Sequence, residues 1–226
     1  MRSVAVGLTL LVAVGACSGE ADTTTTTQGA VAESGSASPE LAVSAIVLAI
    51  GQEDTAALDA NTLTDQLGLL ALVEGASTTD ALAALGFASE QVAASFWRSF
   101  ASDIGNFIDA TVDDIRIGDI ATLDVRGARY ATVEVDFPFD NARRVFVVTE
   151  SNGWKVDLVA TFPGAFVPNI PLAVERASSP GVDTELLASI RRQDVSLEAL
   201  EELGVDERTA EAIAEARERM GGTTGG

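Results

Sequence analysis

The spacing of apolar residues changes near residue 115, and this change constrains the fold more than any other feature. Upstream, the apolar side chains recur at intervals of four: Val92, Phe96, Phe100, Ile104 and Ile108. Such spacing predicts a helix that starts near Ser89 and buries one apolar face. Downstream the interval becomes two, which predicts strands with one wet face. Helices followed by adjacent strands predict an α+β domain whose curved antiparallel sheet wraps the long helix.

Residues 130–137 carry the clearest strand pattern. Apolar positions alternate there with polar ones, in the order Tyr130, Ala131, Thr132, Val133, Glu134, Val135, Asp136 and Phe137. A run at 145–149 and an alternating run at 154–160 flank the turn Ser151-Asn152-Gly153, which predicts a hairpin. Later prolines are expected to end the strand ladder because proline lacks the N–H group that pairing requires: Pro138, Pro163, Pro168 and Pro171.

Helical patterns come before these strands. Ser38-Pro39-Glu40 provides an N-cap residue, a proline for the first turn and an early acid. The helix that follows holds only Ser44 as a polar residue between Leu41 and Ile50, so we expect it to be buried nearly all round. Further helical segments are predicted at residues 54–60 and 62–73, and a short one from Thr78 to Gly86.

A second helical region follows a break at residues 178–181. Segments 182–192 and 196–220 carry helical patterns, so we expect a helical hairpin over residues 178–220 that packs on the preceding domain or on a partner. Residues 221–226 are rich in glycine and are predicted to be a disordered tail.

Residues 197–213 resemble a helix-hairpin-helix motif in length and apolar spacing. That family presents backbone N–H groups of a glycine-rich hairpin to a DNA phosphate. Gly204 matches the first hairpin glycine, but Asp206 stands at the second, and several glutamates surround it. Carboxylates oppose phosphate binding, so only the hairpin architecture is expected and nucleic acid is not a predicted partner.

The stretch from Pro39 to Phe162 resembles the nuclear transport factor two-like family of α+β cones. The resemblance rests on three features: the apolar first helix with the turn at residues 51–54, the alternating strand pattern from Val112 to Phe137, and the run Glu150-Ser151-Asn152-Gly153-Trp154-Lys155-Val156-Asp157. That superfamily also holds ketosteroid isomerases and many secreted bacterial lipoproteins. The resemblance implies a domain at residues 39–177 with a pocket between the sheet and the long helix.

The N-terminus has the pattern of an export signal that ends in a cysteine. Apolar residues run from Val4 to Ala16, which is shorter than the about 20 residues that span a bilayer. The segment Val14-Gly15-Ala16-Cys17 resembles the lipobox of bacterial lipoproteins. The resemblance implies that residues 1–16 are removed and that Cys17 carries lipid. Two acyl chains hold a domain durably at a membrane, so the expected location is the extracytoplasmic face of the cell membrane.

Residues 17–38 are predicted to tether the folded part to that lipid. They include Thr23–Thr27 and are otherwise mostly small or polar, a composition that cannot form a core. A coil of this length has a root-mean-square extent of about 25 Å.

Composition excludes several classes of chemistry. The chain has one cysteine, no histidine and a formal net charge of −20. It therefore has no internal disulfide, no Ser-His-Asp or Cys-His catalytic set and no zinc site of the usual nitrogen and sulfur type. Its charge repels polyphosphates. We expect no cofactor and no metal, and the adjacent arginines Arg191 and Arg192 are expected to make ion pairs with the abundant acids.

Two groups of residues are candidates for a site. Enzymes of the resembling family use an aspartate with a tyrosine or histidine, and here Tyr130 shares a strand face with Glu134 and Asp136. The alternative is that these three side chains simply face solvent. A small apolar ligand would instead contact aromatic side chains: Phe96, Trp97, Phe100, Phe146 and Trp154.

The function that these features favour is a lipid-anchored extracytoplasmic module that binds a ligand or a partner and is not catalytic. Two alternatives stay open at this level. One is an enzyme of the isomerase or dehydratase kind that uses Tyr130 and a carboxylate. The other is a structural envelope protein that docks a partner through the helical hairpin at residues 178–220.

Overall fold

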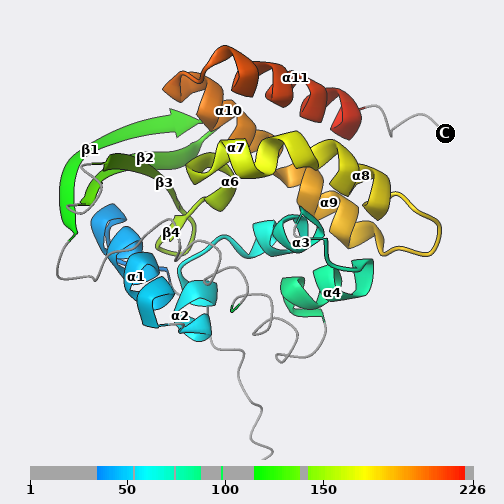
Figure 1. Ribbon diagram of the computed structural model, residues 1–226, viewed down its shortest axis with the longest axis horizontal. Helices are drawn as coiled ribbons and strands as arrows, with labels where there is room; N and C mark the ends of the chain where they lie inside the picture. The colour runs from blue at the N-terminus through cyan, green and yellow to red at the C-terminus, as the bar shows by residue number, and fades with distance from the viewer. Residues whose placement is uncertain are drawn as a thin grey trace, which may run out of the picture. The chain divides into compact units, whose positions relative to one another are not determined.

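The computed structural model describes residues 35–221 except 53, 74, 88–97, 99–114 and 138–141 (Figure 1). Its described elements confirm the α+β class, because helices come before a four-stranded antiparallel sheet and more helices follow it. The predicted long helix, the export signal and most of the tether lie outside the described residues, as do Cys17, Phe96, Trp97 and Phe100.

The residues described before the sheet form these helical elements: α1 (Pro39–Gln52), α2 (Thr55–Ala60), α3 (Thr64–Val73), α4 (Thr78–Leu82) and the π-helical turn Ala83–Phe87. The side chain of Asp54 accepts the Ala57 N–H at 3.1 Å, and Ser77 accepts the Asp80 N–H at 3.2 Å, so both α2 and α4 are capped. The expectation that α1 is buried nearly all round is wrong, since Leu41 and Leu48 are 53% and 39% exposed.

The sheet contains β1 (Arg116–Val125), β2 (Ala128–Phe137), β3 (Ala142–Glu150) and β4 (Trp154–Val156), each antiparallel to the next. The two-residue turn Arg126-Gly127 joins β1 to β2 with positive φ at both residues, as short hairpins require. The predicted turn before Trp154 is present, with positive φ at Asn152 and Gly153.

Alternation along β2 and β3 gives the sheet two different faces. One face is apolar and fully buried, with Ala131, Val133, Val135, Phe146 and Val148 each at 0% exposure. Helix α1 contacts all four strands, and in Figure 1 it lies below the sheet while α10 (Asp194–Leu203) lies above it. The other face carries Tyr130, Thr149 and Lys155, and it is the face that contributes to the pocket described below.

The predicted strand at 154–160 is too long. Strand β4 ends at Val156, and Asp157 caps α6 (Leu158–Thr161) by accepting the Ala160 N–H at 2.8 Å. Alternation was misleading here because Leu158, Val159 and Ala160 are all buried.

Pro163, Pro168 and Pro171 lie in the first turns of helices, where a missing N–H costs nothing: α7 (Pro163–Phe166), the 3-10 turn Val167–Asn169 and α8 (Ile170–Ala177). Helix α8 was not predicted from the sequence.

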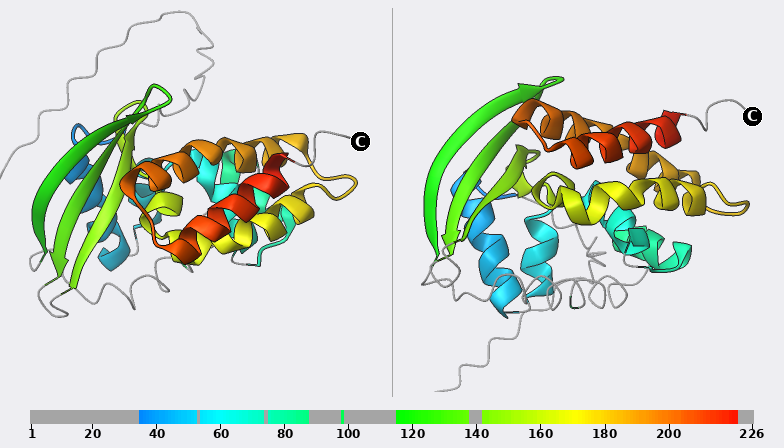
Figure 2. Two further views of the ribbon diagram at one scale, coloured as in Figure 1. Left: turned by 90° about the horizontal axis from the view of Figure 1, so that it is seen from above. Right: turned by 45° about the horizontal axis from the view of Figure 1, so that its top comes forward.

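The C-terminal helices are α9 (Thr184–Arg192), α10 and α11 (Glu207–Gly221). The predicted helical segments are present, but the second is divided into α10 and α11, and Gly221, which was predicted to be in the tail, belongs to α11. Gly204, at φ 79°, ends α10. The apolar side chains of these helices belong to the same hydrophobic core as the sheet: Leu186, Ile190, Leu197, Leu200, Ile213 and Met220. Figure 2 shows the helices packed beside one another at the end of the sheet. The hairpin thus packs on the rest of this chain.

A short N-terminal segment closes the β4 edge of the sheet. The Ser36 N–H donates to the Trp154 carbonyl at 2.9 Å, and the Trp154 N–H donates to the Ser36 carbonyl at 2.7 Å. Gly35 and Gly153 touch so closely that a Cβ on Gly153 would lie 2.6 Å from the Gly35 backbone. The predicted tether therefore meets the folded unit by residue 35. No helix among the described residues has both the length and the apolar character needed to cross a membrane.

Candidate binding pocket

A row of three polar side chains crosses the sheet near its hairpin end. Tyr130 on β2 pairs with Thr149 on β3, and Thr149 pairs with Lys155 on β4. Paired residues on neighbouring strands point to the same face. All three are buried, at 3%, 5% and 4% exposure, and all three line a pocket of about 410 Å³.

Loops and helix ends form the opposite side of this pocket. The start of α3 provides Thr64 and Asp65, the junction of α9 with α10 provides Arg192, Gln193, Val195 and Ser196, and the β3–β4 turn provides Ser151 and Asn152. Apart from Leu63, Ala128 and Val195, every lining residue has a polar side chain. The pocket therefore offers hydrogen-bonding groups from several elements, and few of its side chains are wholly aliphatic.

Ion pairs hold the charged side chains of the lining in place. Arg192 donates to both oxygens of Asp65, at 3.0 and 2.9 Å, and also to Glu185 at 3.0 Å. The hydrogen bond to Asp65 is the largest of the effects that raise the pKa of Arg192. Glu150 pairs with Arg129 at 3.3 Å. The expectation of ion pairs is confirmed for Arg192, whereas the Nε of Arg191 is buried without a hydrogen-bond partner among the described residues.

A buried carboxyl group, Asp157, lies next to the floor of the pocket. Its Oδ1 accepts the Gln66 Nε2 at 2.6 Å and the Ala160 N–H at 2.8 Å, and its Oδ2 is buried without a hydrogen bond among the described residues. Burial raises the pKa of Asp157, and the hydrogen bonds from Ala160, Ser196 and Gln66 only partly oppose that rise. Gln66 also reaches the Ser196 hydroxyl at 3.4 Å, which connects Asp157 to the lining.

The phenol of Tyr130 stays protonated at neutral pH. Burial raises its pKa above the ordinary tyrosine value, and the negative charge of Asp157 raises it further, whereas the hydroxyls of Ser196 and Thr149 lower it. Tyr130 therefore presents a neutral hydroxyl group to the pocket. Such a group donates and accepts hydrogen bonds.

The structure corrects the picture of Tyr130 as a solvent-facing strand residue, because Tyr130 is 3% exposed. The carboxylate whose charge acts on it is Asp157, while Glu134 and Asp136 are half-buried farther along β2 and do not line the pocket. Asp157 was missed because it was assigned to a strand. The signal available in the sequence was an aspartate three residues before Ala160, the spacing of a helix N-cap.

The aromatic candidates that the structure describes do not line this pocket. Phe146 is fully buried on the opposite face, where its ring packs edge-on against Phe162 at a centroid distance of 6.1 Å. Trp154 is also buried, and Arg129 lies over its ring at 5.6 Å. Both side chains fill the core or its edge, so they stabilise the sheet.

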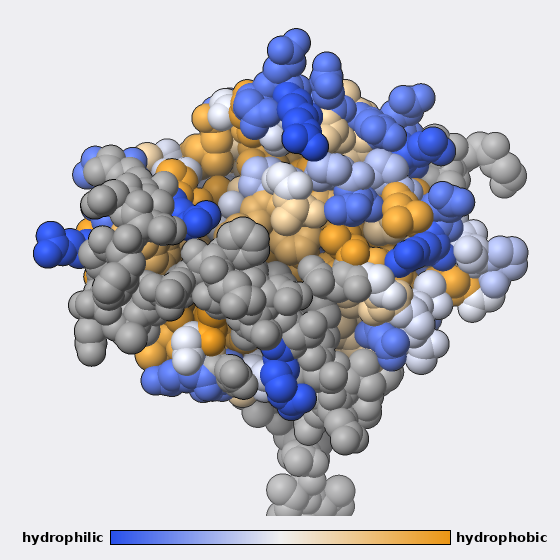
Figure 3. Space-filling model, viewed as in Figure 1, coloured by the Kyte–Doolittle hydropathy of each residue, from blue (hydrophilic) through white to orange (hydrophobic). Residues whose placement is uncertain are grey.

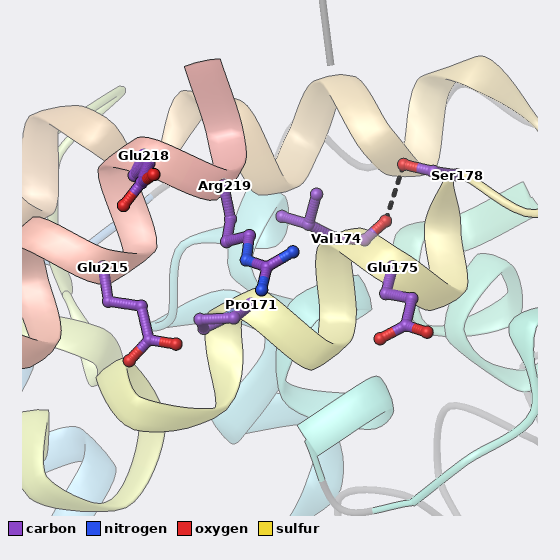
Figure 4. A pocket seen from close by; sticks show the side chains of 7 residues that line it. All are labelled: Pro171, Val174, Glu175, Ser178, Glu215, Glu218 and Arg219. Carbon is purple, nitrogen blue, oxygen red and sulfur yellow. Dashed lines mark hydrogen bonds between the residues drawn. The ribbon is translucent and has the colours of Figure 1, made fainter. Parts of the chain in front are cut away.

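A second hollow lies between α8 and α11, with a volume of about 590 Å³ (Figure 4). Its polar side chains are Glu175, Ser178, Glu215, Glu218 and Arg219, and all of them are exposed. In Figure 4 the glutamates point outward from the two helices, while the Ser178 hydroxyl donates to the Val174 carbonyl at 2.7 Å. Its polar groups are solvated, so the pocket on the sheet is the stronger candidate.

No protein-family model, curated protein or solved structure matches the chain in comparisons with known proteins. Its function is therefore inferred from the pocket itself and from the N-terminal sequence.

Proposed function

We propose that this protein is a lipid-anchored, extracytoplasmic binding module that holds a small polar ligand in the pocket beside the sheet. The observation that carries the proposal is the row Tyr130, Thr149 and Lys155, whose polar groups are withdrawn from bulk water yet line a cavity. Contacts within the chain fix these groups, since Thr149 donates to the Arg129 carbonyl at 3.2 Å and Lys155 also interacts within the chain. A cavity within the usual range of about 300–1,000 Å³ gives these groups room for a ligand.

The N-terminal sequence supports the membrane attachment in this proposal. The apolar run ends at Cys17, the chain's single cysteine, in a lipobox-like context. The chain joins the folded unit at Gly35, whose N–H donates to the Asn152 carbonyl at 2.8 Å. Because Asn152 also lines the pocket, the tether is attached close to the pocket, and a lipid on Cys17 would keep the pocket near the membrane surface.

Binding fits the geometry better than catalysis does. A general base must come within about 3 Å of the proton that it removes. Asp157 is completely buried and does not line the pocket, so it cannot reach a proton of a molecule bound there. Tyr130 is protonated, so neither group is a ready base, whereas both are suited to fix hydrogen-bonding groups in place.

The proposal is tested with the full-length lipidated protein in micelles, by native mass spectrometry of the purified protein followed by titration calorimetry with the recovered ligand. We expect an additional small mass, and weaker binding after Ser196→Ala. Glu215→Gln on α11 is the matched control, because Glu215 is exposed and lies in the other hollow. Equal affinity in the wild type and in Ser196→Ala would place the ligand elsewhere.

A second candidate function is an enzyme of the isomerase or dehydratase kind. It is favoured by one observation, the hydroxyl of Tyr130 in the pocket with the Asp157 carboxyl close behind it. Tyr130→Phe removes this hydroxyl with little change in shape. Turnover of any substrate that retains its wild-type rate in Tyr130→Phe would exclude this role.

The proposal that the helical hairpin at residues 178–220 docks a partner has less support. Its apolar side chains pack into the chain's own core, as Leu197, Leu200 and Ile213 do. Figure 3 shows hydrophilic side chains gathered at the top of the molecule, where Figure 1 places α11. Deleting the hairpin would uncover that core, so surface substitutions on α11 are the better test of docking.

A further inference from the structure

We propose that the ligand of this pocket is a neutral polyhydroxylated molecule, a mono- or disaccharide unit. The inference rests on the proposed binding function and adds the chemical class of the ligand. It follows from three properties of the lining: its charged groups already have partners, its neutral groups both donate and accept, and few of its side chains are wholly aliphatic.

The charged side chains of the lining have partners within the protein. Asp65 is held in a two-point pair by Arg192, Glu150 is paired with Arg129, and Lys155 also interacts within the chain. A charged ligand would have to compete with these existing pairs for the charged groups of the lining. A neutral ligand can bind to the outer atoms of the same groups without disturbing the pairs.

The neutral side chains suit hydroxyl groups. A sugar hydroxyl donates one hydrogen bond and accepts others, so it fits a surface where donors and acceptors lie side by side. Tyr130, Ser196 and Asn152 offer both kinds of group around the cavity. Buried side chains such as Gln193, which donates to the Ser189 carbonyl at 3.0 Å and to the Asp65 carbonyl at 3.3 Å, are fixed before a ligand arrives. Such preorganisation lowers the entropic cost of binding.

The other ligand classes fit less well. The formal charge of −20 repels anions over the whole surface. Leu63, Ala128 and Val195 are the only wholly aliphatic side chains among the lining residues, so an apolar molecule would also cover polar groups and separate them from water. The acids that would attract a cation already have arginine partners. A volume of about 410 Å³ accommodates a sugar unit with bridging water.

The test uses the full-length lipidated protein in a detergent that lacks a sugar headgroup. Glucose, N-acetylglucosamine and maltose are the neutral probes, and acetate and ethanolamine are the charged ones, each titrated by calorimetry at low and high salt. We expect a neutral sugar to bind with a Kd that changes less than about twofold with salt, because screening acts on charges.

Two lining variants and one control locate the site. Asn152→Gly removes an amide while keeping the positive φ of the turn, and Ser196→Ala removes a hydroxyl. Each is expected to weaken sugar binding about five- to tenfold, as the loss of a hydrogen bond does, while Glu215→Gln leaves it unchanged. Circular dichroism and melting curves establish that each variant is folded.

The outcomes separate this inference from the proposed function. Sugar binding that both lining variants weaken supports both proposals. Salt-sensitive binding of a charged probe that Ser196→Ala weakens, with no binding of sugars, overturns the sugar assignment and leaves the binding function standing. Sugar binding that neither variant alters also overturns it. No binding by any probe, together with no copurifying mass, overturns both.

Discussion

Gln66 and Asp157 lie 91 positions apart in the sequence, and the Gln66 side-chain amide donates to the Asp157 carboxyl at 2.6 Å. The other end of the same amide accepts the Leu158 N–H at 2.8 Å. Both side chains are fully buried. One glutamine thus joins α3 to the junction of β4 and α6, directly beside the candidate pocket.

Removing the Gln66 amide should destabilise the protein. In Gln66→Leu the Leu158 N–H and Asp157 Oδ1 each lose a buried partner, so we expect a loss of about 2–4 kcal/mol in the free energy of unfolding. Urea denaturation measures this loss. Gln52→Leu at the exposed end of α1 is the control, and equal effects of the two substitutions would contradict the role of Gln66.

The buried Asp157 should make stability depend on pH. Its pKa is raised in the folded state, so the folded protein binds this proton more tightly than the unfolded chain does. Stability from this group is therefore full below the ordinary aspartate pKa and falls as the pH rises toward the raised value. Asp157→Asn keeps an oxygen that can accept from Gln66 and Ala160 but does not titrate.

We therefore expect the wild type to lose stability relative to Asp157→Asn as the pH rises from acid to neutral. Urea denaturation over a pH series measures the difference between the two proteins. Repulsion among the other acidic groups is common to both and cancels in that difference. A difference that stays constant with pH would show that Asp157 has an ordinary pKa.

Gly153→Ala should detach the N-terminal segment from β4. A Cβ at residue 153 would lie 2.6 Å from Gly35, and the residue has φ 101°. Gly127→Ala is a matched control, since Gly127 has φ 82° but a Cβ there would meet no atom within 4 Å. We expect Gly153→Ala to cost about 1–3 kcal/mol more than its control, with faster hydrogen exchange at the Ser36 and Trp154 amides.

Asp194 should contribute a small, salt-sensitive stabilisation. It accepts from Arg126 at 2.7 Å and from Arg217 at 2.8 Å, and so links the β1–β2 turn to α10 and α11. Partial burial favours the neutral acid, but the two arginines outweigh it and lower the pKa of Asp194. Its contribution is therefore present at neutral pH and lost as the pH falls through that lowered value.

The Asp194 side chain is 32% exposed, so solvent weakens these pairs and Asp194→Asn is expected to cost about 0.5–1.5 kcal/mol at low salt. Thermal unfolding at two salt concentrations measures the effect. Glu202→Gln, at an exposed position on the same helix, should change little. A cost that does not fall with added salt would indicate lost packing instead of lost charge.

Cys17→Ser should release the protein from the membrane or leave it unprocessed, because the substitution removes the thiol that lipid modification requires. Fractionation of cells followed by immunoblotting measures the distribution, and Ser18→Ala serves as the control. Full membrane retention of a processed Cys17→Ser protein would refute the lipid anchor.

Most of the described helices and strands, α6 to α8 excepted, could be predicted from the sequence because they depend on local periodicity. The alternation at Tyr130 to Phe137, the turn before Trp154 and the break near Gly204 each act over a few residues. The strand prediction for Trp154 to Ala160 was wrong after Val156, because a buried helix and a buried strand can be made of the same apolar residues. In the structure Asp157 caps α6 and also accepts from Gln66 of α3, and the second contact has no local signal in the sequence.

Neighbouring residues are enough to specify the α+β class, the hairpin positions and the lipobox-like N-terminus, since each of these features is local in the chain. The pocket, by contrast, exists only in the folded protein. Tyr130 and Ser196 come from a strand and a helix, and Gln66 reaches Ser196 across 130 positions. No local sequence pattern specifies contacts between residues so far apart in the chain, because these contacts depend on how the hydrophobic core brings distant elements together.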